Sequence, residues 1–164
     1  MFNIGDVIIY SEHGLCEIDD IRDQTFAGVT RKYYILHPLD DANLKISTPV
    51  DNDKVVMLRT MDKEEADLLL QTFNGPGIEW IEDSRQRNLK YGKIVQSGDR
   101  TEIAQVANTL IRKNLELKSN GKRIYDQDRK LLQTIQTNLF NELALSLETS
   151  YEDIEQRVND MLQE

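Results

Sequence analysis

Apolar and polar residues alternate over short stretches in the first 59 residues, a pattern typical of half-buried β-strands. Turn residues such as His13-Gly14 and Gly28 separate these stretches. Alternation turns one face of each strand inward and leaves the other in water, so the pattern predicts a small β-barrel or a strongly bent sheet. The five predicted strands cover residues 7–10, 16–21, 33–36, 44–47 and 55–58.

After residue 60 the apolar positions recur every three or four residues, which is the period of an amphipathic helix. Asp62, Asp99 and Ser150 each precede such a stretch and are residue types that cap helix N-termini. A further helix is predicted over 83–95, and the break at 119–121 precedes a long helix. The apolar stripes comprise Ala66, Leu69, Leu70 and Phe73; Ile103, Val106, Ala107, Leu110 and Ile111; Leu132, Ile135, Leu139 and Leu143; and Ile154, Val158, Met161 and Leu162.

The change of period near residue 60 divides the chain into a strand-rich part, 1–60, and an all-α part, 61–164. A length of 164 residues suffices for one domain of ordinary size or for two small ones. We therefore expect the α+β fold class, with an N-terminal barrel or bent sheet followed by a C-terminal helical bundle.

Acidic residues outnumber basic ones, 29 against 20, which gives a net charge of −9. Because phosphate repels a strongly negative protein, this balance argues against a free-standing, high-affinity DNA binder. The charge is uneven, however: residues 79–130 carry 12 basic and 8 acidic side chains, whereas residues 131–164 carry 1 and 7. The cationic stretch is either a solvated helix face or a binding surface, and charge alone leaves both readings open.

Several classes of protein do not fit the sequence. No run of about 18 apolar residues is present, so we expect no membrane-spanning helix. The N-terminus lacks the basic and apolar regions of a secretory signal. A single cysteine, Cys16, cannot form an internal disulfide and fits a reducing compartment. These features together predict a cytoplasmic protein.

Candidate catalytic and metal-ligating residues are few. His13 and Cys16 are three residues apart, but a cysteine in a predicted strand is more typically a small buried apolar residue than a nucleophile. With His37 they offer too few ligands at suitable spacing for a metal site. Gly75-Pro76-Gly77 lacks the Lys-Ser/Thr of a phosphate-binding loop. We expect no enzyme, metal, cofactor or small-molecule substrate; an enzyme using Cys16 and His13 is the rival hypothesis.

Trp80 is the only tryptophan, and it lies just before the cationic stretch. Arg85, Arg87 and Lys90 follow it on a predicted helix, where residues three apart, such as Arg87 and Lys90, share a face. Cations bind phosphates while an apolar side chain enters a base step, so these four residues form a candidate DNA-binding site. The alternative is that Trp80 fills the core of the helical part, which composition alone favours.

Short motifs occur along the chain in a fixed order: Phe2-x-x-Gly5-Asp6-x-Ile8-Ile9-Tyr10-x-x-His13-Gly14, Tyr33-Tyr34-Ile35-Leu36, Leu44-Lys45-Ile46-Ser47-Thr48-Pro49, Val56-Met57-Leu58-Arg59, Trp80, Ser97-Gly98-Asp99 and Glu142-Leu143-Ala144. Their order and spacing resemble those of the CarD/CdnL family of bacterial transcription regulators. The resemblance extends over nearly the whole chain.

This resemblance implies that residues 1–60 form a Tudor-like domain that binds the β subunit of RNA polymerase, like the related domain of the transcription-repair coupling factor. It implies that residues 61–164 contact promoter DNA at the upstream edge of the melted region and prolong the open complex. Trp80 then enters the minor groove and is exposed or half-exposed, and the protein associates with the nucleoid through polymerase. The implied polymerase-binding residues are Leu44, Lys45, Ile46, Ser47, Thr48 and Pro49.

The sequence departs from the family pattern at Ser47, where a basic residue is common, and at Cys16, where a second glycine is expected. We expect the polymerase contact to use Lys45 and the backbone of the strand edge, which tolerates side-chain changes. Docking raises the local concentration of the helical part near DNA to the order of millimolar, so a weak DNA contact suffices. The alternative function is an acidic protein-interaction adaptor that makes no DNA contact.

Overall fold

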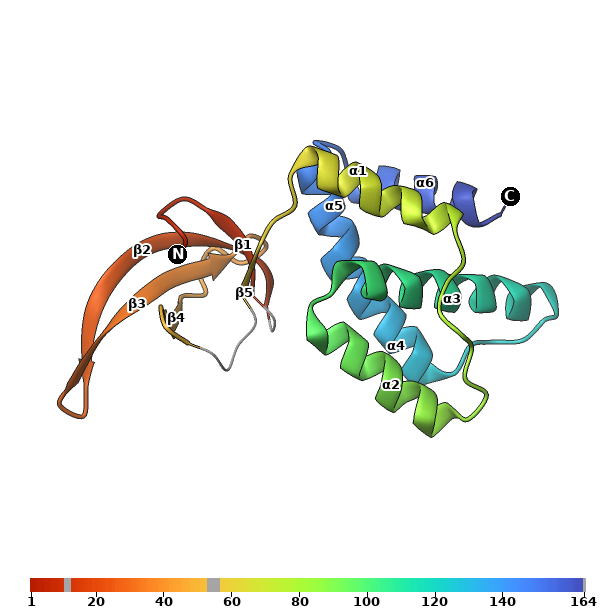
Figure 1. Cartoon of the computed structure of the whole chain (residues 1–164), viewed down its shortest axis with the longest axis horizontal. Coiled ribbons are helices and arrows are strands. Elements are labelled where there is room, and N and C mark those ends of the chain that lie inside the picture. Colours follow the sequence, from red (N-terminus) through yellow and green to blue (C-terminus); the bar gives the residue numbers. More distant parts are fainter. Residues whose placement is uncertain (11–12, 53–56, 164) are drawn as a thin grey trace. The chain divides into compact units, whose positions relative to one another are not determined.

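The computed structural model describes residues 1–10, 13–52 and 57–163, and the chain forms two compact units, Met1–Thr60 and Met61–Glu164. Each unit has a hydrophobic core of its own. The first unit is a five-stranded antiparallel sheet and the second is built from helices (Figure 1). The predicted α+β class, a bent sheet followed by a helical bundle, is therefore confirmed.

The sheet has the strand order β4-β3-β2-β1-β5, so β4 and β5 lie at its two edges. The predicted strand 7–10 is correct, whereas β2 and β3 run further than predicted because their polar ends pair with each other in solvent. Val55 and Val56 of the fifth predicted strand lie outside the described residues. The strands are β1 (Val7–Tyr10), β2 (Gly14–Phe26), β3 (Val29–Pro38), β4 (Ile46–Pro49) and β5 (Met57–Arg59).

Alternation along the strands builds the core of the sheet. In the register of β1 and β2, Ile8 lies opposite Cys16, and both side chains are fully buried. A β-bulge between Ile18 and Asp20 shifts the pairing of β2 with β3 by one residue. The core cluster comprises Ile8, Tyr10, Cys16, Ile18, Tyr34 and Leu36.

Beyond the pairing of β3 with β4, which ends at Tyr33, β2 and β3 continue as a two-stranded hairpin (Figure 1). Its turn consists of Ala27 and Gly28, which both have positive φ, 52° and 79°. Positive φ at both central residues is the backbone of a tight hairpin turn whose twist matches that of the strands. The break predicted at Gly28 is therefore a turn within one continuous hairpin.

The three predicted N-caps of the helical unit are confirmed. The side chain of Asp62 accepts a hydrogen bond from the Glu65 backbone at 2.8 Å, and the Asp99 and Ser150 caps have the same geometry. Among the described residues, no helix is long and apolar enough to cross a membrane. The helical elements are α1 (Lys63–Gln71), η1 (Thr72–Asn74), α2 (Ser84–Ser97), α3 (Arg100–Ser119), α4 (Asp126–Ile135), η2 (Gln136–Phe140), α5 (Asn141–Ser146) and α6 (Tyr151–Leu162).

The single long helix predicted after 119–121 is divided. Helix α4 passes through the π-helical segment η2 before α5 continues the chain. A π-helical turn widens the helix, and here the adjacent residues Leu139 and Phe140 are both buried. The predicted stripe is buried as expected, but period alone did not indicate the extra core residue Phe140.

Candidate functional site

Trp80 lies in the loop 75–83, between η1 and α2. Two side chains of α3 hold the first half of this loop. The Nδ2 of Asn108 donates to the Gly75 carbonyl at 3.1 Å, and the hydroxyl of Thr109 donates to the Ile78 carbonyl at 2.7 Å. The backbone that leads to Trp80 is therefore fixed on α3.

The two residues that flank Trp80 are held by α2. The Tyr91 hydroxyl donates to the Glu79 carbonyl at 2.6 Å, and Nη1 of Arg87 donates to the Ile81 carbonyl at 2.7 Å. Tyr91 and Arg87 are four residues apart, share the inward face of α2, and are both buried. Trp80 itself is half-buried: it packs against the hydrophobic core of the helical unit, as the core alternative predicted in part, and it remains partly exposed to solvent.

The sequence predicts that Arg87 and Lys90 share a helix face as DNA contacts, but Arg87 is only 1% exposed. Its Nε and Nη2 donate to the carboxylate of Asp128 on α4, at 3.0 and 2.6 Å, as a bidentate pair. Asp128 is buried as well, and its carboxylate raises the pKa of Arg87 above the ordinary value. A guanidinium bound in this way does not reach a phosphate, so we remove Arg87 from the predicted DNA contacts.

Arg87 instead contacts the ring of Trp80. Its Cζ lies 4.1 Å from the Trp80 ring centroid and 5.7 Å from that of Tyr125. Lys113 of α3 places its Nζ 5.1 Å from the Trp80 centroid. These distances are within the range of cation–π attraction. Sequence reasoning missed Lys113 and Tyr125, since both are far from Trp80 along the chain and only the packing of α3 and α4 brings them near.

Arg85 and Lys90, the other predicted DNA contacts, are exposed on α2, as is Lys93. These cations and the half-buried indole ring belong to the same unit, and we call Trp80, Arg85, Lys90, Lys93 and Lys113 the Trp80 site. A cavity of about 240 Å³ is lined in part by Arg87 and Tyr125. Its lining includes two carboxylates, so we do not assign it to phosphate; the lining residues are Ser84, Arg87, Tyr125, Asp126, Gln127 and Asp128.

The predicted polymerase-binding residues 44–49 lie at one edge of the sheet. Strand β4 starts at Ile46, so Leu44 and Lys45 precede it as exposed residues. Ser47 is exposed, whereas Thr48 is buried and accepts a hydrogen bond from Asn52 at 3.2 Å. Within the described residues β4 pairs only with β3, which leaves its other backbone edge open. Pro49, which has no N–H, ends this edge strand.

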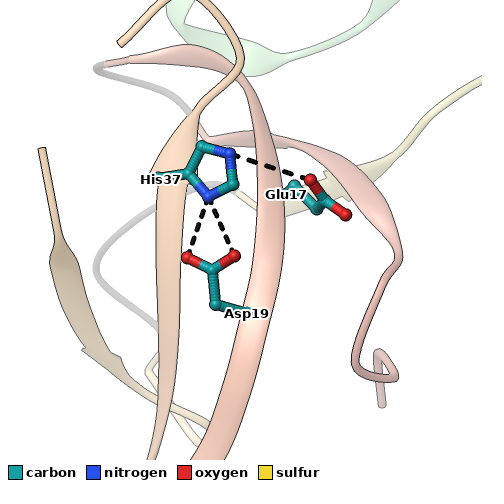
Figure 2. A group of neighbouring side chains, drawn as sticks. All are labelled: Glu17, Asp19 and His37. Carbon is teal, nitrogen blue, oxygen red and sulfur yellow. Dashed lines mark hydrogen bonds and ion pairs between the residues drawn. The ribbon is translucent and has the colours of Figure 1, made fainter. Parts of the chain in front are cut away.

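Lys45 is tied to a group of charged residues on the neighbouring strands. Its Nζ donates to Asp19 at 3.0 Å, and Nδ1 of His37 donates to the same carboxylate at 2.8 Å. Figure 2 shows His37 between two carboxylates, with Glu17 3.7 Å from its Nε2. The hydrogen bond from His37 and then that from Lys45 lower the pKa of Asp19 below its ordinary value.

Glu17, Asp19 and His37 are also residue types that bind metals, and their ligand atoms lie within 4.8 Å of one another. Both oxygens of Asp19, however, accept hydrogen bonds from side chains of the protein itself. We therefore interpret the group as a charge network that positions Lys45 next to β4.

The hairpin carries a surface that the sequence analysis missed. Three cross-strand pairs of β2 and β3 lie on one side of the hairpin, because successive pairs are two residues apart along each strand. These pairs are Arg22–Tyr33, Gln24–Arg31 and Phe26–Val29. The ring of Phe26 contacts that of Tyr33 at 5.6 Å, and Gln24 accepts a hydrogen bond from Ser47 at 3.0 Å, which joins this side to β4. The hairpin face, as we call it, consists of Arg22, Gln24, Phe26, Val29, Arg31 and Tyr33, and Arg22 is ion-paired with Asp20 at 3.3 Å at its base. Its signal in the sequence is the alternation of arginine and aromatic residues around Gly28.

Comparison with known families identifies both units. Residues 2–61 match the CarD-like/TRCF RID domain, where TRCF is the transcription-repair coupling factor. Residues 68–159 match the C-terminal domain of CarD. The two matches follow each other in the order of the two structural units and together indicate an RNA polymerase-interacting transcription regulator. The chain therefore belongs to the CarD-like family.

Proposed function

We propose that this chain acts without catalysis, binds the β subunit of RNA polymerase through its sheet, and stabilises the open promoter complex through its helical unit. The helical unit contacts promoter DNA at the upstream edge of the melted region, where Trp80 enters the minor groove. The observation that carries this proposal is the half-buried ring of Trp80, held in an anchored loop of a unit with exposed cations.

Two surfaces of the sheet support polymerase binding. The edge of β4 that faces away from β3 pairs with no strand of the described residues, so its backbone can accept an added strand, and such pairing is insensitive to Ser47 in place of a basic residue. The hairpin face continues from β4 through the bond between Ser47 and Gln24. Arginine and aromatic side chains are enriched in protein interfaces, so this face supplies the side-chain contacts that the strand edge lacks.

The Trp80 site supports a DNA contact that is weak alone. Arg85 and Lys90 are free to approach phosphates, and the indole ring is large enough to enter an unstacked base step. The net charge of −9 opposes binding to free DNA. Docking on polymerase offsets this, because the helical unit then meets DNA at a local concentration on the order of millimolar.

The positions of Cys16 and His13 argue against the rival hypothesis of an enzyme that uses them. Cys16 is fully buried in the sheet, and burial raises the pKa of its thiol to about 11. His13 is exposed, and its ring lies against that of Tyr10 at 5.8 Å. A buried, neutral thiol is a poor nucleophile.

The decisive experiment measures the lifetime of the open promoter complex with the Trp80→Ala variant. A base–aromatic contact contributes about 1–3 kcal/mol, so we expect the lifetime to fall by about tenfold. Polymerase binding by the full chain should not change, because the sheet is intact. The matched control is Leu89→Ala, which removes an exposed apolar side chain of α2 and should leave the lifetime unaltered.

Thermal unfolding of the same variant separates the two roles of the ring. If Trp80 served only as core, its removal would cost about 3–5 kcal/mol of stability and the lifetime would not change for the protein that stays folded. That result would favour the acidic adaptor without DNA contact over the proposed regulator.

A further inference from the structure

We infer that Arg87 is a positioning residue for Trp80: it fixes the orientation of the ring before DNA is met. This inference rests on the proposed function of Trp80, since Arg87 would act on DNA only through that ring. It gives a role to a buried arginine that sequence reasoning had placed among the direct DNA contacts.

One guanidinium holds three parts of the helical unit at once. Its Nε and Nη2 bind Asp128 of α4, and its Nη1 binds the carbonyls of Ile81 and Glu82 at 2.7 and 3.3 Å. Its Cζ lies 4.1 Å from the centroid of the Trp80 ring. Arg87 thus connects the ring, the loop that follows the ring, and a helix residue 41 positions away in the chain, with Asp128 as the fixed point.

The side-chain chemistry requires arginine at this position. A guanidinium is planar and carries five N–H donors in a fixed fork, so it binds a carboxylate and two carbonyls while one face lies on an aromatic ring. A lysine ammonium keeps the charge but lacks the plane and the fork. The substitution Arg87→Lys would therefore keep the bond to Asp128 or the bond to the loop, but not both together with the contact to the ring.

Fixing the ring in advance matters because the free part of a half-buried side chain on a loop must otherwise be ordered when it binds. Preorganisation removes that entropic cost and so strengthens binding without any new contact. The bond from Tyr91 to the Glu79 carbonyl, on the other side of Trp80, anchors the backbone of the loop. Arg87 anchors the backbone as well, through the Ile81 carbonyl, and also contacts the ring itself.

The test uses the fluorescence of Trp80, which reports on this position alone because the chain has a single tryptophan. The first variant is Arg87→Lys, which keeps the charge opposite Asp128. The second is Arg87→Met combined with Asp128→Leu, which removes both charges so that neither remains buried without a partner. The matched control is Arg85→Met, on the exposed side of the same helix.

In both Arg87 variants we expect a folded protein by circular dichroism, a larger acrylamide quenching constant and faster local motion of Trp80 by anisotropy decay. The Arg85 control should match the wild type in both fluorescence measurements. The open-complex lifetime should shorten several-fold in the Arg87 variants, and adding Arg87→Lys to Trp80→Ala should shorten it no further than Trp80→Ala does.

Two results would overturn the inference. One is unchanged quenching and anisotropy of Trp80 in the folded Arg87 variants. The other is a loss of lifetime from Arg87→Lys that adds in full to that of Trp80→Ala, because Arg87 would then act independently of the ring. If Trp80→Ala itself has no effect on lifetime, the proposed function fails, while the fluorescence measurements still decide whether Arg87 positions the ring.

Discussion

Trp80 is anchored through its neighbouring backbone, and its ring packs partly against the helical core while the residue stays partly exposed. Hydrogen bonds to the carbonyls of Glu79 and Ile81 fix the chain on either side, and Arg87 covers the ring at 4.1 Å. At the scale of single residues, Trp80 therefore combines a fixed loop backbone with a ring that contacts both the core and solvent, and the Trp80→Ala variant decides which contact matters for function.

Replacing glycine by alanine should have opposite effects on stability at two positions of the helical unit. A Cβ on Gly77 would come within 2.9 Å of the Thr109 backbone nitrogen, so Gly77→Ala forces the loop away from α3 and should cost about 1–3 kcal/mol of stability. A Cβ on Gly92, inside α2, meets nothing within 4 Å, and Gly92→Ala should add about 0.5–1 kcal/mol. Urea unfolding of both variants measures the difference. Equal effects would contradict the close contact of the loop with α3.

The thiol of Cys16 should be unreactive in the folded protein. Burial, followed by the charge of Asp40, raises its pKa to about 11, so the thiol stays protonated at neutral pH. We expect the reaction with a disulfide reagent such as DTNB to be slow in buffer and rapid in guanidinium chloride, where the sheet is unfolded. Cys16→Ala should leave the open-complex lifetime unchanged. Fast labelling of the native protein, or loss of function in Cys16→Ala, would revive the enzymatic hypothesis.

Among the elements, β4 is the one whose disruption should abolish polymerase binding. Ile46→Pro removes a backbone donor at the start of this edge strand and bends it, so an added strand loses its template. Co-purification of full-length variants with RNA polymerase measures the effect. Lys90→Ala, in the helical unit, is the control and should bind polymerase as the wild type does. Retention of polymerase by Ile46→Pro would show that β4 is not the docking strand.

The charge network of β2 and β3 predicts a loss of stability at low pH. Hydrogen bonds from His37 and Lys45 lower the pKa of Asp19 in the folded state, and its value in the unfolded chain is about 3.9. Asp19 therefore contributes stability above that value, and the contribution is lost as the pH falls through the lower, folded pKa. Unfolding of the wild type and Asp19→Asn should differ at about pH 6, and the gap should begin to close only as the pH falls below about 4. A difference in stability that does not change with pH would exclude this role of Asp19. Glu17, the other carboxylate beside His37, does not substitute for Asp19, because it lies further from the imidazole ring, at 3.7 Å.

Period and capping residues predict the elements of this chain well, because both act over a few neighbouring residues. Asp62, Asp99 and Ser150 each mark a real helix start. Contacts between residues far apart in the sequence cannot be predicted in this way. Arg87 and Asp128 are 41 residues apart, and each is of a type usually found at the surface. Only the packing of α2 against α4 makes them a buried pair, so the sequence pattern assigned Arg87 to the wrong side of its helix.

At the scale of the whole molecule, positive and negative charges are unevenly distributed along the chain. The exposed cations of the Trp80 site lie within a stretch of net positive charge, 12 basic against 8 acidic residues over 79–130, while residues 131–164 carry 1 against 7. Negative charge over the rest of the chain repels bulk DNA and leaves only a small contact area. Under the proposed function, affinity for promoter DNA is conditional on docking through the sheet, and polymerase, rather than a DNA sequence, determines where the protein acts.

This arrangement predicts that the free protein binds duplex DNA weakly and with a modest, measurable salt dependence. If about three cations of the Trp80 site meet phosphates, the logarithm of the binding constant should fall with the logarithm of salt concentration with a slope of about −3. Lys90→Ala should reduce the magnitude of that slope by about one. Lys32→Ala, on the hairpin of the sheet, should not change it. Titrations at several salt concentrations, followed by Trp80 fluorescence, give these slopes directly. Tight binding that is insensitive to salt in the absence of polymerase would mean that the free chain recognises DNA by itself, and docking would no longer be needed to explain its action.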